Sequence, residues 1–287
     1  MRFLTGIDWL RLRKAAGDEA EYFVPAVETS SPKVLCNIKG IILDFDGTIF
    51  DNTRIAVNLI ASYFPDMIRI RNERFVRKHF TGCDYSTPEE YYNTFFSALG
   101  KLCFCSPQRI RNWYFNRYMP RMVRVLRKHY KPREGFTELF RLMGASAEIT
   151  TGNLKRANFP QVAVYSDYPM IKERLEALGL HPSKRIKLYG PDSFGAQKPA
   201  VRPFRRIAED FGLQPEEILV IGDRDDTDGL GAFRAGMRFF CLKTGQKRYF
   251  RLDPYRRHEK EEPHGPFLAM YAGTWDDLYK LLIGKFS

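Results

Sequence analysis

Two aspartates stand directly after an apolar run in "GIILDFDGT", residues 40–48. Asp44 and Asp46 are separated by one residue, and the run before them has the composition of a buried strand. A protein interior accepts carboxylates only when cations or hydrogen-bond donors compensate them. The sequence therefore predicts that partners for this pair come from elsewhere in the chain.

Further polar residues occupy similar places later in the chain. Ser166 ends an apolar run, Lys198 precedes a predicted helix, and Asp223 and Asp228 follow the apolar stretch 218–222. One lysine cannot balance four carboxylates, so this set calls for a metal ion. An all-oxygen ligand set suits Mg²⁺.

The elements that must position these residues form an alternating pattern. From residue 131 onward, short apolar runs alternate with helical patterns, which predicts an α/β fold with a doubly wound parallel sheet covered on both faces. Ligands of such sheets bind beyond the carboxyl ends of the strands. The predicted strands are 41–45, 161–166, 185–190, 217–223, 238–242 and 267–272, and Thr274 is expected to cap a last helix.

The segment 53–130 has a helical pattern with little strand signal, which predicts an inserted all-helical domain. The remaining divisions are an N-terminal extension, 1–37, and an α/β core made of 38–52 and 131–287. Thr87 with Pro88 and Glu90 marks one helix start, as a cap, a first-turn proline and a capping-box glutamate. Pro120 is expected to kink a later helix.

Composition limits the classes of function. The 287 residues carry a formal net charge of +12, which favours anionic ligands. No apolar run reaches the roughly 18 residues of a membrane span, and the charged N-terminus lacks a signal peptide's apolar region, so we expect a cytoplasmic protein without membrane contact. The five scattered cysteines fit reduced thiols.

These residues together resemble the haloacid dehalogenase (HAD)-like phosphohydrolase superfamily. Its four motifs are matched in order: DxDGT by "DFDGT", the strand-end serine by Ser166, the lysine by Lys198 in "KPAVRPF", and GDxxxxD by "GDRDDTD". The resemblance covers about residues 39 to 241, and the helical segment stands where the superfamily's C1 cap is inserted, as in phosphoglycolate phosphatases. Asp167 stands where relatives often carry asparagine.

The resemblance implies a role for each matched residue. Asp44 would attack phosphorus to give an aspartyl-phosphate, and Asp46 would protonate the leaving group and then activate water. Mg²⁺ would be held by Asp44, Asp223 and the backbone carbonyl of Asp46, with Asp228 orienting the site. The residues expected to bind the phosphoryl group are Thr48, Ser166 and Lys198.

Asp46 favours a phosphomonoester hydrolase or a phosphomutase, because superfamily dehalogenases lack an acid at this position. The substrate expected is a small phosphorylated metabolite. Cations at helical spacing in this segment, Arg117, Arg121 and Arg124, form a basic stripe that is either a set of substrate contacts or a solvated basic face. A phosphate-binding or nucleic-acid-binding protein without turnover is the competing class, and nucleic acid is the least favoured ligand. A calcium-binding EF-hand loop is excluded, because Gly47 falls at the fourth loop position and an EF-hand has its glycine at the sixth.

Overall fold

A six-stranded sheet forms the centre of the protein. The computed structural model describes residues 38–144, 160–242 and 270–278, so the expected extension 1–37 lies outside the described residues. Every pair of neighbouring strands in the sheet is parallel, in the order β3-β2-β1-β4-β5-β6. The strands are β1 Gly40–Asp44, β2 Gln161–Tyr165, β3 Ile186–Tyr189, β4 Ile218–Gly222, β5 Arg238–Leu242 and β6 Met270–Gly273. The predicted α/β parallel sheet is confirmed.

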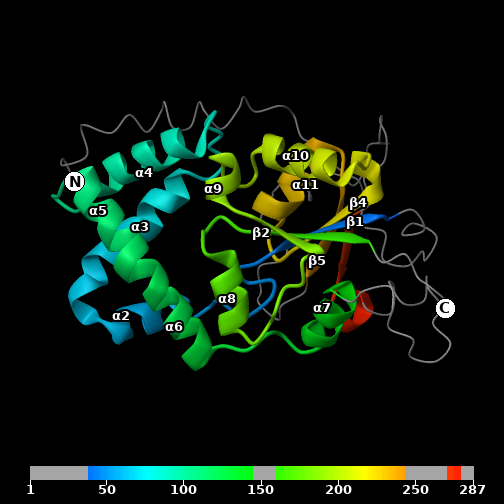
Figure 1. Ribbon diagram of the computed structural model, residues 1–287, viewed down its shortest axis with the longest axis horizontal. Helices are drawn as coiled ribbons and strands as arrows, with labels where there is room; N and C mark the ends of the chain where they lie inside the picture. The colour runs from blue at the N-terminus through cyan, green and yellow to red at the C-terminus, as the bar shows by residue number, and fades with distance from the viewer. Residues whose placement is uncertain (1–37, 145–159, 243–269, 279–287) are drawn as a thin grey trace, which may run out of the picture.

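Helices cover both faces of the sheet (Figure 1). Two helices, α7 Phe136–Gly144 and α8 Ile171–Ala177, lie on one face, and α10 Val201–Phe211 and α11 Leu230–Ala235 lie on the other. Strand β1 is buried along its whole length, with Ile41 and Leu43 in one hydrophobic cluster and Ile42 in the other. This two-sided burial explains why its sequence is apolar without alternation.

The register of the strands fixes where their polar ends meet. Asp44, the last residue of β1, pairs with Tyr165, so Ser166 follows directly beside it. On the other side Leu43 pairs with Ile221, which places Asp223 just beyond the same edge. The carboxyl edge of the central strands therefore collects the polar residues that the sequence singled out.

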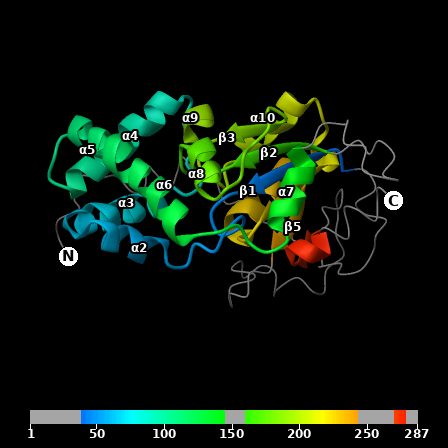
Figure 2. The same cartoon turned by 60° about the horizontal axis from the view of Figure 1, so that its bottom comes forward.

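After β1, the five helices α2 to α6 form a bundle beside the sheet (Figures 1 and 2). We call residues 55–129 the helical insert. Its helices are α2 Ile55–Ser62, α3 Met67–His79, α4 Pro88–Leu102, α5 Pro107–Trp113 and α6 Met119–His129, with shorter turns at Phe64–Asp66 and Tyr114–Tyr118.

The predicted helix signals of the insert are confirmed. The hydroxyl of Thr87 accepts from the Glu90 backbone N–H at 3.1 Å, and Pro88 is the first residue of α4. The irregularity expected at Pro120 lies just before it, as the π-helical turn Tyr114–Tyr118 between α5 and α6. Proline lacks an N–H and its ring clashes with the carbonyl four residues earlier, which falls inside this turn.

The insert is tied to the core near Lys198. Three backbone hydrogen bonds of 3.0 Å join residues 82–85, after α3, to residues 195–198, before α10. Arg202 of α10 reinforces this tie by donating to the carboxylate of Asp84 and to the Tyr85 carbonyl. The loop that carries Lys198 is therefore braced by the insert. We call this pairing the insert–core clamp.

The C-terminal part of the fold is described as far as residue 278. The predicted cap Thr274 accepts from the Asp277 N–H at 3.2 Å, and Trp275 to Leu278 are helical. Among the described residues, every helix is too short or too polar to cross a bilayer. The described cysteines are all free thiols.

Candidate active site

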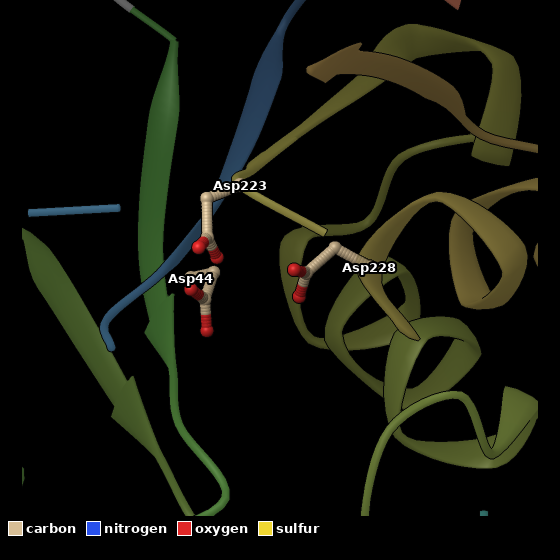
Figure 3. Close-up of side chains that lie close together, drawn as sticks. All are labelled: Asp44, Asp223 and Asp228. Atoms are coloured by element: carbon tan, nitrogen blue, oxygen red, sulfur yellow. The ribbon is translucent and has the colours of Figure 1, made fainter. Parts of the chain in front are cut away.

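Three aspartates converge at the carboxyl edge of the sheet (Figure 3). Asp44 ends β1, Asp223 follows β4, and Asp228 lies in the turn before α11. One carboxylate oxygen from each lies within 4.8 Å of the others, and Figure 3 shows Asp223 and Asp228 pointing toward Asp44. Asp44 and Asp228 are buried. The structure thus brings together the aspartates that the sequence placed at separate strand ends.

Lys198 supplies the positive charge of this cluster. Its ammonium contacts a carboxylate oxygen of Asp44 and lies 2.7 Å from Asp228 Oδ1. Burial opposes the charged form of this lysine, but the carboxylates of Asp228 and Asp44 outweigh burial and hold the pKa of Lys198 well above its ordinary value. The lysine is therefore a permanent cation that bridges two of the three acids.

The acidic charge of the cluster exceeds what Lys198 balances. Burial, followed by the proximity of Asp44, raises the pKa of Asp223 to about 7. The same two causes raise the pKa of Asp228 well above its ordinary value. In addition, Asp223 Oδ1 is buried without a hydrogen-bond partner. A buried, unpaired carboxylate oxygen beside a second carboxylate is what a hard divalent cation requires, so the residues fit Mg²⁺.

Asp46, two residues after Asp44, makes a different set of contacts. Its carboxylate forms an ion pair with Arg174, and its Oδ2 accepts from the Ser166 hydroxyl at 3.1 Å. Arg174 is fully buried, donates to Ser166 Oγ at 2.9 Å, and stacks on the ring of Phe45 at 4.0 Å. Ser166 is therefore engaged with Asp46 and Arg174. No signal in the sequence distinguishes Arg174 from the other charged residues of α8.

Thr48 braces the carboxylate of Asp44. Its buried hydroxyl donates to Asp44 Oδ2 at 2.7 Å, so Thr48 and Lys198 hold opposite oxygens of the same carboxylate. This contact orients Asp44 rigidly. The hydroxyl that the sequence assigned to the phosphoryl group is thus, in this structure, a hydrogen-bond donor to Asp44.

The turn after β1 depends on Gly47. Its φ of +97° is a conformation that L side chains rarely adopt, and a Cβ there would lie 2.3 Å from Asp223 Oδ2. Arg133, where the chain returns from the insert, donates to the Gly47 carbonyl at 3.0 and 2.8 Å. The turn is therefore shaped by a glycine and held from the far end of the insert.

Asp167 closes the site behind Lys198. Its Oδ1 accepts from the Lys198 backbone N–H at 3.0 Å, and its carbonyl accepts from Arg77 of the insert at 2.6 Å. Burial raises the pKa of Asp167, although Lys198 opposes this shift. Asp167 thus joins the end of β2 to the loop that carries Lys198.

A pocket of about 840 Å³ joins this cluster to the insert. We call the sheet edge with Asp44, Asp46 and Asp223 the floor, and the side of α3 that lines the pocket the roof. The roof residues that line the pocket are Arg74, Phe75, Arg77 and Lys78.

Arg117, Arg121 and Arg124, expected as substrate contacts or as a solvated basic face, do not line this pocket. Arg121 is also not part of an exposed stripe, because it is buried and its Nη2 pairs with Asp66 at 2.9 Å. Arg117 and Arg124 are exposed, at the mouths of other hollows of the insert. Arg117 and Arg124 thus have the exposed positions of a solvated basic face, and Arg121 does not. That these arginines contact substrate stays a prediction, and most of the insert residues that line the pocket come from α3.

Comparison with known proteins gives the relatives of this chain. The family model for haloacid dehalogenase-like hydrolases matches residues 38–236. Over 74 residues the chain is 35% identical to the glyceraldehyde 3-phosphate phosphatase of Methanopyrus kandleri, a match that covers 26% of this chain and 31% of that enzyme. The chain thus spans less than a third of that relative's length.

Solved structures share the fold across most of both chains. A 2-haloacid dehalogenase from Pseudomonas syringae pv. tomato DC3000 has a TM-score of 0.53 at 14% identity, covering 86% of this chain and 99% of that one. A predicted phosphoglycolate phosphatase from Haemophilus somnus 129PT has a TM-score of 0.52 at 17% identity, with coverages of 85% and 98%. A HAD-hydrolase from Bacillus subtilis bound to magnesium has a TM-score of 0.53 at 16% identity, with coverages of 86% and 99%.

Proposed function

This chain belongs to the haloacid dehalogenase-like hydrolase family, and from that membership we propose that it is a Mg²⁺-dependent phosphomonoester hydrolase acting on a small phosphorylated metabolite. The observation that carries the proposal is the pair Asp44 and Asp46 on the floor of one pocket, because an ester with an alcohol leaving group needs an acid besides the nucleophile. The partial match to a glyceraldehyde 3-phosphate phosphatase supports the same reaction class. Free thiols fit a reducing compartment, so we place the protein in the cytoplasm.

The proposed reaction has two displacements at phosphorus. In the first, a carboxylate oxygen of Asp44 forms a bond to phosphorus while the bond to the ester oxygen breaks, and Asp46 gives that oxygen its proton. In the second, Asp46 takes a proton from water, whose oxygen attacks the aspartyl-phosphate and releases inorganic phosphate and the Asp44 carboxylate. Both steps balance without a further reactant.

The contacts of Asp44 support its assignment as the nucleophile. Thr48 and Lys198 fix its two oxygens from opposite sides, which limits the rotation of the carboxylate before attack. Lys198 and Ser166 carry the donors that we assign to the phosphoryl oxygens, with Thr48 nearby. Asp228 acts through Lys198, whose ammonium it holds at 2.7 Å.

We assign the metal site to Asp44, Asp223 and the backbone carbonyl of Asp46. The unpaired buried Oδ1 of Asp223 supports this assignment. Mg²⁺ bound there supplies charge neutralisation for the phosphoryl oxygens. The residues of the chain supply the nucleophile, the proton and the orientation.

The proposal is tested by incubating the purified full-length protein with Mg²⁺ and a panel of phosphate monoesters, and by measuring both released phosphate and isomerised ester. We expect released phosphate, with turnover abolished in Asp44→Asn while the circular dichroism spectrum is unchanged. Isomerised ester without phosphate would instead indicate a phosphomutase of the same fold. Wild-type turnover by Asp44→Asn would remove Asp44 as the nucleophile, and an intact panel would reject the hydrolase assignment.

A further inference from the structure

The carboxylates of the active-site pocket and the cations of α3 come from different sides of the pocket. The carboxylates of Asp44, Asp223 and Asp228 lie on the floor, whereas α3 presents Arg74 and Lys78 from the roof. The floor therefore suits a metal ion and a phosphoryl group. The roof offers positive charge to the rest of the same ligand.

Most cations that line this pocket are already paired. Lys198 pairs with Asp44 and Asp228. The pairs Arg77 with Glu73, at 2.6 Å, and Arg224 with Asp226, at 2.8 Å, account for two more. Within the part of the chain that the structure describes, Arg74 and Lys78 have no carboxylate within 4.0 Å.

The two unpaired cations are placed together by their spacing. They stand four residues apart on α3, so they lie one above the other on one face of the helix. Like charges at this spacing destabilise a helix by about 0.2–0.5 kcal/mol, so the arrangement opposes helix stability. Both are exposed, unlike Arg77, which is turned into the protein. The two side chains are therefore free to contact a ligand.

An exposed apolar side chain lines the pocket beside these cations. Phe75 of α3 is 39% exposed, whereas Met122 of α6 and Leu59 of α2, which also line the pocket, are buried. A short carbon skeleton would contact Phe75 while its phosphoryl group lies on the floor. Any charged group at the far end of that skeleton would then meet the roof.

We propose that Arg74 and Lys78 form a subsite for a second anionic group on the substrate, a carboxylate or a second phosphate. This inference rests on the proposed function and names its substrate class. Charge-assisted hydrogen bonds from a guanidinium and an ammonium are the recognition that such a group requires, and the guanidinium binds carboxylate or phosphate in a bidentate manner. The substrate is then a phosphate monoester whose leaving group is itself negatively charged.

Binding of non-hydrolysable phosphonates tests the subsite without relying on turnover. Titration calorimetry of the full-length protein with Mg²⁺ would compare phosphonoacetate, which adds a carboxylate, and methylenebisphosphonate, which adds a second phosphonate, with ethylphosphonate, which adds neither. We expect at least one of the probes with two anionic groups to bind about tenfold or more tightly than ethylphosphonate. The tighter of these two probes identifies the second anionic group as a carboxylate or a phosphate.

The preference is the ratio of the affinity for the tighter of these probes to the affinity for ethylphosphonate. Arg74→Gln and Lys78→Gln should each lower this ratio, and the double variant should bring it close to one. The matched control is Arg71→Gln, which removes an exposed cation of α3 that does not line the pocket, and it should keep the wild-type preference. An equal affinity for all three probes in the wild type, or an unchanged preference in the double variant, would overturn the subsite. If the probes discriminate but no ester is hydrolysed, only the proposed function fails.

Discussion

The guanidinium of Arg174 forms an ion pair with the carboxylate of Asp46, from a position where Arg174 itself is fully buried. The same guanidinium donates to Ser166 and stacks on Phe45, so its orientation is fixed by its surroundings. Asp46 is the proposed proton donor. Its position relative to Asp44 is therefore set by a residue of α8 that itself takes no part in the proposed bond changes.

Replacing Arg174 with glutamine should lower kcat by about 10²-fold, because a displaced acid no longer meets the leaving oxygen. The loss should be smaller in Arg174→Lys, which keeps the charge. A positioning role is separated from a structural one by comparing an alkyl phosphate with p-nitrophenyl phosphate, since the nitrophenolate leaves without needing a proton. Equal losses of kcat on the two esters, in a variant that is still folded, would contradict the positioning role of Arg174.

Asp46→Asn should show the same dependence on the leaving group more strongly. Loss of general acid catalysis lowers turnover by about 10²–10⁴-fold for an alkyl ester, and less for the nitrophenyl ester. Single-turnover measurements with the nitrophenyl ester should then show the aspartyl-phosphate accumulating, because Asp46 is also the proposed base of the second step. A variant with wild-type turnover of the alkyl ester would exclude Asp46 as the acid.

The pKa of Asp223 predicts how pH affects the metal-free protein. Burial raises this pKa from 3.8 to about 7 in the folded state, so between these values the folded state holds a proton that the unfolded state has lost. Stability without metal should therefore fall as the pH rises from about 4 to 7 and then level off, since unfolding no longer changes proton uptake. Asp228 shifts in the same direction and adds to the effect.

Thermal unfolding measured across this range, with EDTA or with Mg²⁺, tests this expectation. The rise in Tm caused by Mg²⁺ should be larger at pH 8 than at pH 5.5, because the metal competes with the proton for Asp223. Asp223→Asn should lose most of the metal-dependent rise and part of the pH dependence. A Mg²⁺ effect that is independent of pH in the wild type would argue against Asp223 as a ligand.

Gly47→Ala should destabilise the protein and disturb the metal site together. A positive φ costs a non-glycine residue about 1–3 kcal/mol, and the new Cβ would also collide with Asp223 Oδ2. Gly212→Ala is the matched control, because Gly212 has a φ of +66° but open space where a Cβ would lie. Urea unfolding should show the larger loss for Gly47→Ala, and only this variant should weaken Mg²⁺ binding.

Two arginines of α6 should differ in their effect on stability. Arg121→Ala leaves the buried Asp66 with only its partner Arg69, and breaking a buried pair in this way costs roughly 3 kcal/mol. Arg124→Ala removes an exposed cation of the same helix and should change the free energy of unfolding by less than about 0.5 kcal/mol. Similar unfolding midpoints for the two variants would show that the Arg121 pair contributes little.

The part of the site that could be predicted from sequence is the part that follows from strand ends. Asp44, Lys198 and Asp223 stand beside apolar runs or helix starts, and a parallel sheet brings such positions to one edge whatever the loops between them do. The alternation of apolar runs and helical patterns predicted the sheet, and the helical pattern without strand signal predicted the insert after its first strand. Local capping signals gave the helix starts.

The part that could not be predicted depends on pairings between distant segments. Arg174 and Asp46 are 128 residues apart, and α8 reads as an ordinary charged helix. Arg121 stands at the same helical spacing as neighbouring cations that are exposed. It is buried because it forms an ion pair with Asp66, and the sequence pattern does not reveal this pairing. Periodicity identifies the face of a helix on which a residue lies, but it does not identify what that face meets.

The insert–core clamp couples the helical insert to the position of Lys198. Its three backbone hydrogen bonds join the chain just after α3 to the loop that carries this lysine. A movement of α3 away from the sheet edge would therefore either break these hydrogen bonds or pull Lys198 away from Asp44. The geometry of the roof and the geometry of the proposed phosphoryl-binding lysine thus depend on each other.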